Sequence, residues 1–101
     1  MDRPEKFILI GREVVPENDL MKWAKAFESS NRQIAKSVVM EPVTVSTIFL
    51  GSDHSHGAGG PKLFETMIFG GTHDQFQDRC GTYEEAEAMH QRAIDMIKGG
   101  A

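Results

Sequence analysis

Four ionisable side chains lie close together in the sequence, next to segments that favour β-strands. Asp53, His54 and His56 occupy a glycine-rich stretch between two apolar runs, and Glu65 lies inside the second run. Imidazole and carboxylate groups can exchange protons, hold a metal ion or orient a ligand, depending on what surrounds them. The segment from residue 45 to residue 71 is therefore where a binding or acid–base site is expected first.

The His-x-His pair in this segment suggests a metal site. Alternate side chains of an extended chain point to the same side, so His54 and His56 could bind Zn²⁺ or Fe²⁺ together. Asp53 lies beside them, and His73 and Asp74 could reach the ion from a neighbouring loop. A solvated connection between two strands accounts for the same residues, and no further ligand spacing accompanies the pair. We therefore expect no metal and no other cofactor.

The glycine-rich stretch 57–62 superficially resembles a phosphate-binding loop. A true P-loop leads from a strand into a helix and ends in Gly-Lys-Ser or Gly-Lys-Thr. This stretch ends in Pro61-Lys62 and leads into an apolar run typical of a strand. Its glycines therefore indicate a mobile loop over residues 51–62, not a nucleotide site.

Glu65 is unusual because it interrupts an apolar strand. A period of two places its carboxylate on one face with three apolar side chains, those of Leu63, Met67 and Phe69. A carboxylate in such surroundings needs a cation or a hydrogen-bond donor, because burying an unpaired charge is costly. Either Glu65 contributes to a site, or it lies on a water-exposed edge strand or pairs with Arg32 or Lys62.

His90 presents the same question on a helix. Residues at helical spacing form the inward stripe of the last helix: Tyr83, Ala86, His90, Ala93, Ile94 and Ile97. A histidine in such a stripe is a core residue with satisfied hydrogen bonds or, if it faces Glu65 or Asp53, half of an acid–base or ligand-binding pair. The candidate ligand-binding site therefore consists of four residues, Asp53, His54, Glu65 and His90.

The elements that must position these residues can be placed from spacing. Helices are expected over residues 18–30, from an i, i+3, i+4, i+7 pattern, and over 83–98, where Thr82 and Glu85 have capping-box spacing. Strands are expected over 7–10 with a tight hairpin to 15, over 34–40, 43–50 and 63–70, and as a short edge strand over 75–80. This order predicts an α+β fold, with an antiparallel sheet of about four to five strands and both helices packed on one face.

Length and composition limit the class of protein. A chain of 101 residues forms one domain, with flexible ends at about residues 1–5 and 99–101. The net charge of −4 and the scattered lysines and arginines argue against nucleic acid as a partner. Cys80 is the only cysteine, which excludes an intrachain disulfide. No segment has a signal-peptide pattern or transmembrane length, so we expect a cytoplasmic protein that is not bound to a membrane.

Three parts of the chain carry a family resemblance, namely VSTIFLG followed by DH, then LFETMIFGG, and finally TYEEAEAMH. They resemble a family of small proteins encoded by tailed phages and bacterial mobile elements, and the likeness extends over most of residues 20–90. Four residues match the pattern: Asp53, His54, Glu65 and His90. His56 departs from it, and His73 falls at a variable place. The resemblance implies a phage context and carries no activity with it.

These observations lead to three hypotheses about function. The first is a non-enzymatic binding module, a phage accessory protein that binds a host protein or a small ligand in the host cytoplasm, with interference in a host defence as one such role. The second is a small hydrolase, either metal-assisted or with His54 or His90 as base and Glu65 or Asp53 as its orienting group. The third is a minor structural or assembly component of the virion. Exposed apolar residues or an open sheet edge would favour a homodimer.

Overall fold

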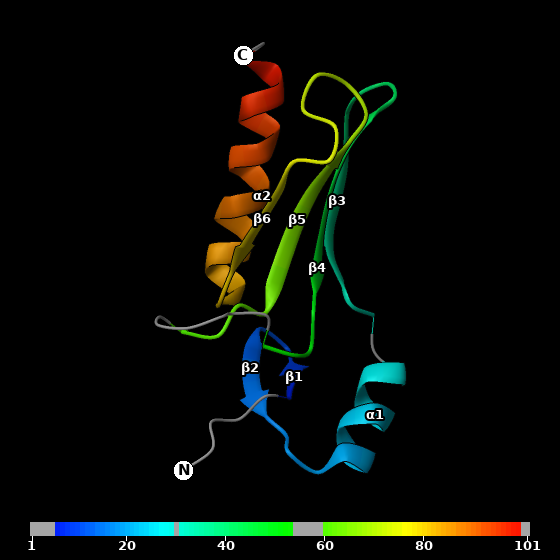
Figure 1. Ribbon diagram of the computed structural model, residues 1–101, viewed down its shortest axis with the longest axis vertical. Helices are drawn as coiled ribbons and strands as arrows, with labels where there is room; N and C mark the ends of the chain where they lie inside the picture. The colour runs from blue at the N-terminus through cyan, green and yellow to red at the C-terminus, as the bar shows by residue number, and fades with distance from the viewer. Residues whose placement is uncertain (1–5, 30, 54–59, 100–101) are drawn as a thin grey trace.

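The computed structural model describes residues 6–29, 31–53 and 60–99 of the chain. It contains a two-stranded and a four-stranded antiparallel sheet and two helices (Figure 1). The strands are β1 (Phe7–Ile10), β2 (Glu13–Pro16), β3 (Gln33–Met40), β4 (Val43–Phe49), β5 (Phe64–Phe69) and β6 (Gln77–Cys80). The helices are α1 (Leu20–Ser29) and α2 (Tyr83–Lys98). The predicted α+β class and the four-stranded antiparallel sheet are confirmed.

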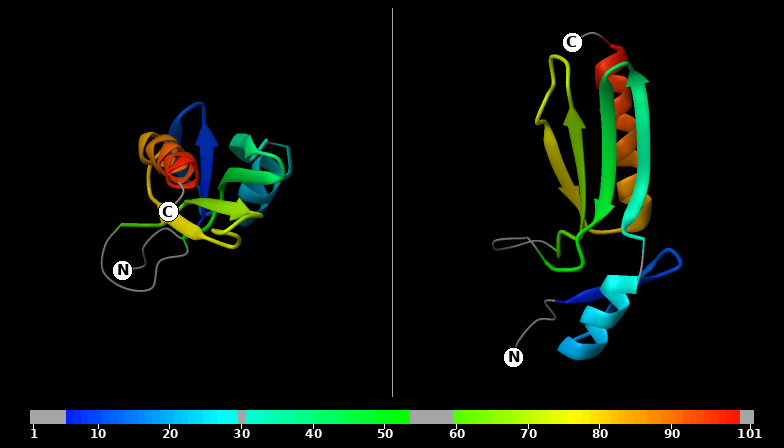
Figure 2. Two further views of the ribbon diagram at one scale, coloured as in Figure 1. Left: turned by 90° about the horizontal axis from the view of Figure 1, so that it is seen from above. Right: turned by 90° about the vertical axis from the view of Figure 1, so that its right-hand side faces the viewer.

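The four-stranded sheet has the order β3-β4-β5-β6, and α2 packs on one of its faces (Figures 1 and 2). Every second residue of β4 is buried, namely Val43, Val45, Thr47 and Phe49. The buried residues of β5 are Phe64, Thr66 and Ile68. Because alternate residues of a strand share a face, these buried residues all lie on the side that α2 covers. The opposite side carries the half-buried and exposed residues of the same strands.

The core consists of two apolar clusters. One gathers β1, the β6 end of the sheet and the first half of α2 around Phe49, Phe64 and Met89. The other gathers the tip of the β3–β4 hairpin and the second half of α2 around Val45, Ile68 and Ile97. Buried polar residues of β4, β5 and α2 lie between the two clusters, and they define the first candidate site below.

The first helix, α1, packs beside β1 at one end of the larger sheet (Figure 1). The indole Nε1 of Trp23 donates to the carbonyl oxygens of Phe7 (3.0 Å) and Gly51 (2.9 Å). The ring of Phe27 stacks on that of Trp23 with centroids 4.8 Å apart. These two aromatic residues attach α1 to the rest of the protein, since none of its side chains is fully buried.

The second helix begins as its sequence predicts. Thr82 and Glu85 form a complete capping box, in which the backbone N–H of Glu85 donates to the Thr82 hydroxyl and the Glu85 carboxylate accepts from the N–H of Thr82. Arg12, in the β1–β2 turn, pairs with Glu87 of α2, and its guanidinium lies 4.6 Å from the ring centroid of Tyr83. The N-terminal hairpin is thereby tied to α2. No described helix is long and apolar enough to cross a membrane.

Candidate functional site

A chain of polar side chains crosses the core between the two apolar clusters. His90 is 7 % exposed, and its Nδ1 lies 2.7 Å from the hydroxyl of Thr47, while its Nε2 lies 2.9 Å from the hydroxyl of Ser37. The Thr47 hydroxyl also contacts that of Thr66 at 2.5 Å. Both threonines are completely buried. The imidazole therefore has a hydroxyl partner at each ring nitrogen.

Burial determines the protonation state of this imidazole. It lowers the pKa of His90 below the usual value of 6.5, because the charged form would lose its hydration. The ring is therefore neutral near pH 7, so one of its nitrogens donates and the other accepts. Hydroxyl groups can fulfil either role, and all four residues can be satisfied at once. This is how a polar group is accommodated in a core, and it fits the interpretation of His90 as a satisfied core residue.

Sequence reasoning did not identify the partners of His90. Thr47 and Thr66 occupy buried positions of β4 and β5, two strands in which buried and outward residues alternate. A threonine at a position that alternation assigns to the apolar face indicates a buried hydroxyl that needs a partner. Ser37 carried no such signal, because its approach to His90 depends on how α2 crosses β3.

Glu65 lies on the opposite face of the sheet from His90. It sits between the buried residues Phe64 and Thr66, so its side chain points away from α2. Its Oε2 accepts from Nε of Arg79 at 2.9 Å and from the amide of Gln77. Arg79 is the residue directly opposite it on β6. The structure thus does not bring Glu65 and His90 together, and the cation beside Glu65 is neither Arg32 nor Lys62.

Asp53 closes the base of the glycine-rich segment. Its carboxylate accepts from the backbone N–H of Lys62 at 3.1 Å, across the segment between them. His54 and His56 lie outside the described residues, so the predicted His-x-His pair lies there as well. Among the residues that the structure does describe, no three histidine, cysteine, aspartate or glutamate side chains are placed to hold a metal ion.

Cys80 is buried against α2 and is a weak nucleophile. Burial, together with the smaller effect of the neighbouring Glu85 carboxylate, raises the pKa of its thiol to about 11. Since the thiolate is the reactive form, this cysteine is inert near pH 7. Its place in the core is therefore that of a small apolar residue.

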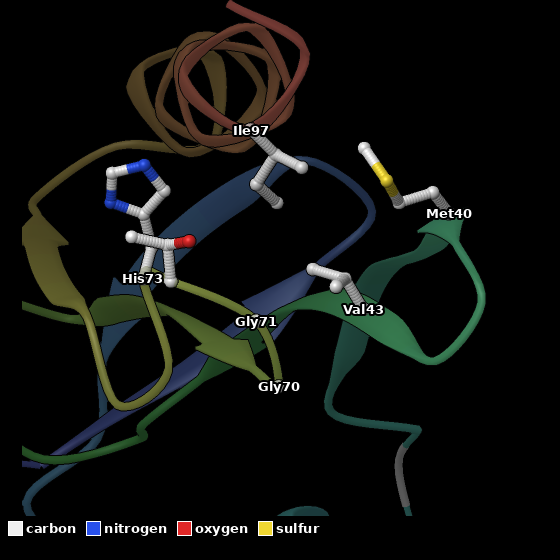
Figure 3. A pocket seen from close by; sticks show the side chains of 7 residues that line it. Met40, Val43, Gly70, Gly71, His73 and Ile97 are labelled. Carbon is white, nitrogen blue, oxygen red and sulfur yellow. The ribbon is translucent and has the colours of Figure 1, made fainter. Parts of the chain in front are cut away.

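A small pocket lies at the other end of the sheet, and sequence reasoning did not predict it. Its lining consists of Met40, Val43, Gly70, Gly71, Thr72, His73 and Ile97. In Figure 3 the side chains of Met40, Val43, His73 and Ile97 converge above the Gly70–Gly71 turn. The pocket volume is about 190 Å³. It forms where the C-terminal turn of α2 passes over the tips of two hairpins.

The turn under this pocket is held in a defined shape. The Asp74 carboxylate accepts from the N–H of Gly70 at 2.6 Å, and the N–H of Phe76 donates to the carbonyl of His73 at 2.9 Å. Gly70 and Gly71 have φ of 91° and 72°, a backbone conformation that favours glycine. Within the described part of the chain, Nε2 of His73 is a buried polar atom without a hydrogen-bond partner.

Comparison of the chain with protein-family models, with curated proteins and with solved structures gives no match.

Proposed function

We propose that this protein is a non-enzymatic binding module, and that it holds a partner protein through the pocket at the tips of the β3–β4 and β5–β6 hairpins. The pocket is the observation that carries the proposal. Its walls are mainly apolar, and its rim includes Met40, which is 55 % exposed. A concave apolar recess at the end of a rigid sheet is a typical binding site.

The pocket size indicates what enters it. Small-molecule sites usually have volumes of roughly 300–1000 Å³, whereas an engineered cavity of about 150 Å³ accommodates benzene. A volume of about 190 Å³ therefore matches one apolar side chain, such as a phenylalanine or leucine, better than a whole metabolite. Single side chains that fill such recesses are frequent anchors of protein–protein interfaces. We infer that the partner presents one apolar anchor residue.

The side chains around the recess suit an adaptable contact. Met40 is unbranched, and its thioether can adjust to the shape of an incoming group. Thr72 is exposed at the rim and provides a hydroxyl. The candidate catalytic groups have structural partners: His90 bonds to hydroxyls, and Glu65 pairs with Arg79. These pairings support a binding role over a chemical one.

The phage resemblance supports a biological setting for this binding. In that setting the protein acts in the cytoplasm of a bacterial host, and the anchor belongs to a host protein. Interference with a host defence is one role that such capture would serve.

Photo-cross-linking tests the proposal. A benzoylphenylalanine replaces Met40 in the protein expressed in its natural host, and a matched variant carries it at Met21, which is 80 % exposed on α1. We expect one protein to be cross-linked from Met40 and not from Met21, and mass spectrometry then identifies it. Cross-links of equal yield from both positions would argue against a site at the pocket.

The identified partner is then purified, and its affinity is measured by calorimetry. Thr72→Trp places a large side chain over the recess, and Gln91→Trp adds the same group at an exposed site of α2. We expect Thr72→Trp to weaken binding by about tenfold or more, as loss of an anchor contact does, and Gln91→Trp to have no effect. Equal affinity for both variants would overturn the assignment of the pocket.

A hydrolase is the second candidate, because of one specific geometry. The Ser37 hydroxyl lies 2.9 Å from Nε2 of a neutral histidine, an arrangement in which the ring could accept the hydroxyl proton. A fluorophosphonate probe tests this directly, since an activated serine displaces fluoride and keeps the phosphonyl group. The binding-module proposal expects no labelling of Ser37. Labelling that disappears in His90→Gln would establish the hydrolase instead.

A virion component is the third candidate, and mass spectrometry of purified phage particles tests it. Stoichiometric presence of the chain in the particles would favour that role over a host-directed one.

A further inference from the structure

Among the helices and strands that the structure describes, none packs on the face of the four-stranded sheet opposite α2 (Figure 2, right). We call this surface the open face and define it by the outward residues of its strands, which lie in three rows across the sheet. Val38, Thr44 and Phe69 form the first row, where β3, β4 and β5 are in register. Val38 is 58 % exposed and Phe69 is 43 % exposed. These two exposed apolar side chains lie on either side of Thr44, and exposed apolar surface on one face of a sheet favours contact with a partner.

The other two rows become more polar toward the α1 end of the sheet. The middle row contains Lys36, Ser46 and Met67, again paired in register. The last row contains Ile48, Glu65 and Arg79, of which the latter two form an ion pair with each other. The open face thus has an apolar end and a polar end whose main charges are already compensated.

Charge indicates which partner suits this face. The chain has a net charge of −4, so most surfaces of two copies repel each other at neutral pH. The open face carries Lys36, Glu65 and Arg79, one carboxylate against two cations. Two copies that meet through their open faces therefore avoid contact between their acidic surfaces. Two cations per face are too few to hold a nucleic-acid backbone.

We propose that a second copy of this chain covers the open face, so that the protein is a homodimer with two sheets stacked face to face between two α2 helices. A twofold axis parallel to the strands places the apolar end of one face on the apolar end of the other, because such a rotation preserves position along the strands. The same axis brings Lys36 of each copy toward the β6 side of the other, where Gln77 lies in the same row and the Glu65–Arg79 ion pair in the next. Stacked sheets with interdigitating side chains are a stable arrangement for antiparallel strands.

Sedimentation velocity and light scattering test the proposal on the full chain, from low micromolar to submillimolar concentration. We expect a species of twice 11.2 kDa that dissociates on dilution. Val38→Asp and Phe69→Asp each place a charge in the apolar row and should raise the dimer Kd by about tenfold or more. Met21→Asp introduces the same charge at an exposed methionine of α1 and should leave the Kd unchanged.

Circular dichroism of each variant shows that it is folded, and a folded monomeric Phe69→Asp supports the proposal. Contacts seen by isotope-filtered NMR between the Phe69 ring of one copy and the methyl groups of another would place the interface directly. A wild-type chain that stays monomeric over the whole range would overturn the proposal. So would a dimer that withstands both open-face substitutions, because it would have to use another surface. We expect Thr72→Trp to leave this dimer intact, because Thr72 lies at the pocket and not on the open face. The dimer proposal and the pocket proposal are therefore tested independently.

Discussion

His90 is the residue whose surroundings explain most about this core. An imidazole and two threonine hydroxyls are buried between two apolar clusters, the Ser37 hydroxyl beside them is half-buried, and each of these groups has a partner from another element. A buried polar group without a partner is costly, so the network is satisfied only when β3, β4, β5 and α2 have one relative arrangement. At the residue scale the network therefore selects the packing of α2 on the sheet.

Thr47→Val tests the contribution of the network to stability. The substitution keeps the volume of the side chain but removes the hydroxyl that contacts both His90 and Thr66. We expect the free energy of unfolding to fall by about 1–3 kcal/mol, the usual penalty for unsatisfied buried polar groups. Urea denaturation measures it. Thr72→Val, at an exposed position outside the network and the open face, should change stability by less than about 0.5 kcal/mol. Equal losses would contradict a structural role for the network.

The pH dependence of folding provides a second test of His90. Its pKa is lowered in the folded state, so the unfolded chain binds more protons once the pH falls below about 6.5. Stability should therefore be constant above that pH and decrease as the pH falls toward the folded pKa, with a slope of at most about 1.4 kcal/mol per pH unit. Unfolding free energies at about pH 8 and about pH 5 measure the difference. His90→Gln should reduce the slope, and an unchanged slope in this variant would contradict the assignment to His90.

At the element scale, α1 is the least supported part of the fold. It is attached through Trp23 and Phe27, both of which lie against Gly51. Gly51 has φ of 76°, and a Cβ added there would lie 2.4 Å from Cε1 of Phe27. Glycine is therefore required at this position for two reasons: the positive φ is unfavourable for other residues, and a side chain would clash with the Phe27 ring.

Two alanine substitutions separate these requirements. Gly11 also has a positive φ, of 63°, but nothing lies within 4 Å of its added Cβ. We expect Gly11→Ala to destabilise the protein by about 1–2 kcal/mol, from backbone strain alone. Gly51→Ala should be worse by a further roughly 1–3 kcal/mol, because the ring must move. Thermal unfolding gives the comparison, and hydrogen exchange of the α1 amides should accelerate only in Gly51→Ala. Identical behaviour of the two variants would show that Phe27 does not hold α1.

On the scale of the whole molecule, the fold divides the surface into an α2 side and an open face, with the pocket at one end. If the open face is a dimer interface, folding and association are coupled, and the melting temperature depends on protein concentration. A tenfold increase in concentration should stabilise the dimer by about 1.4 kcal/mol. Fluorescence of Trp23 during heating reports unfolding at each concentration. We expect the dependence to vanish in Phe69→Asp, and a melting temperature independent of concentration in wild type would contradict the dimer.

The sequence by itself determined the elements and their class. Apolar residues at helical or alternating spacing, the Thr82–Glu85 capping box and the glycine turns are local signals, so the two helices and most strands could be predicted from them. It also indicated that His90 is buried, because its neighbours at helical spacing are apolar. The edge strand β6 begins at Gln77 instead of residue 75, since Gln75 has a φ of 73° in the preceding turn.

Only the tertiary structure decided which ionisable groups meet. Glu65 and His90 belong to different elements, and the pleat of β5 directs Glu65 to the face opposite α2, where Arg79 of the neighbouring strand pairs with it. The partners of His90 and the pocket at the hairpin tips likewise arise where α2 crosses the strands. Local spacing fixes the face of a residue within its own element. The contacts between elements depend on strand register and helix placement, because these bring together residues that are distant in the chain.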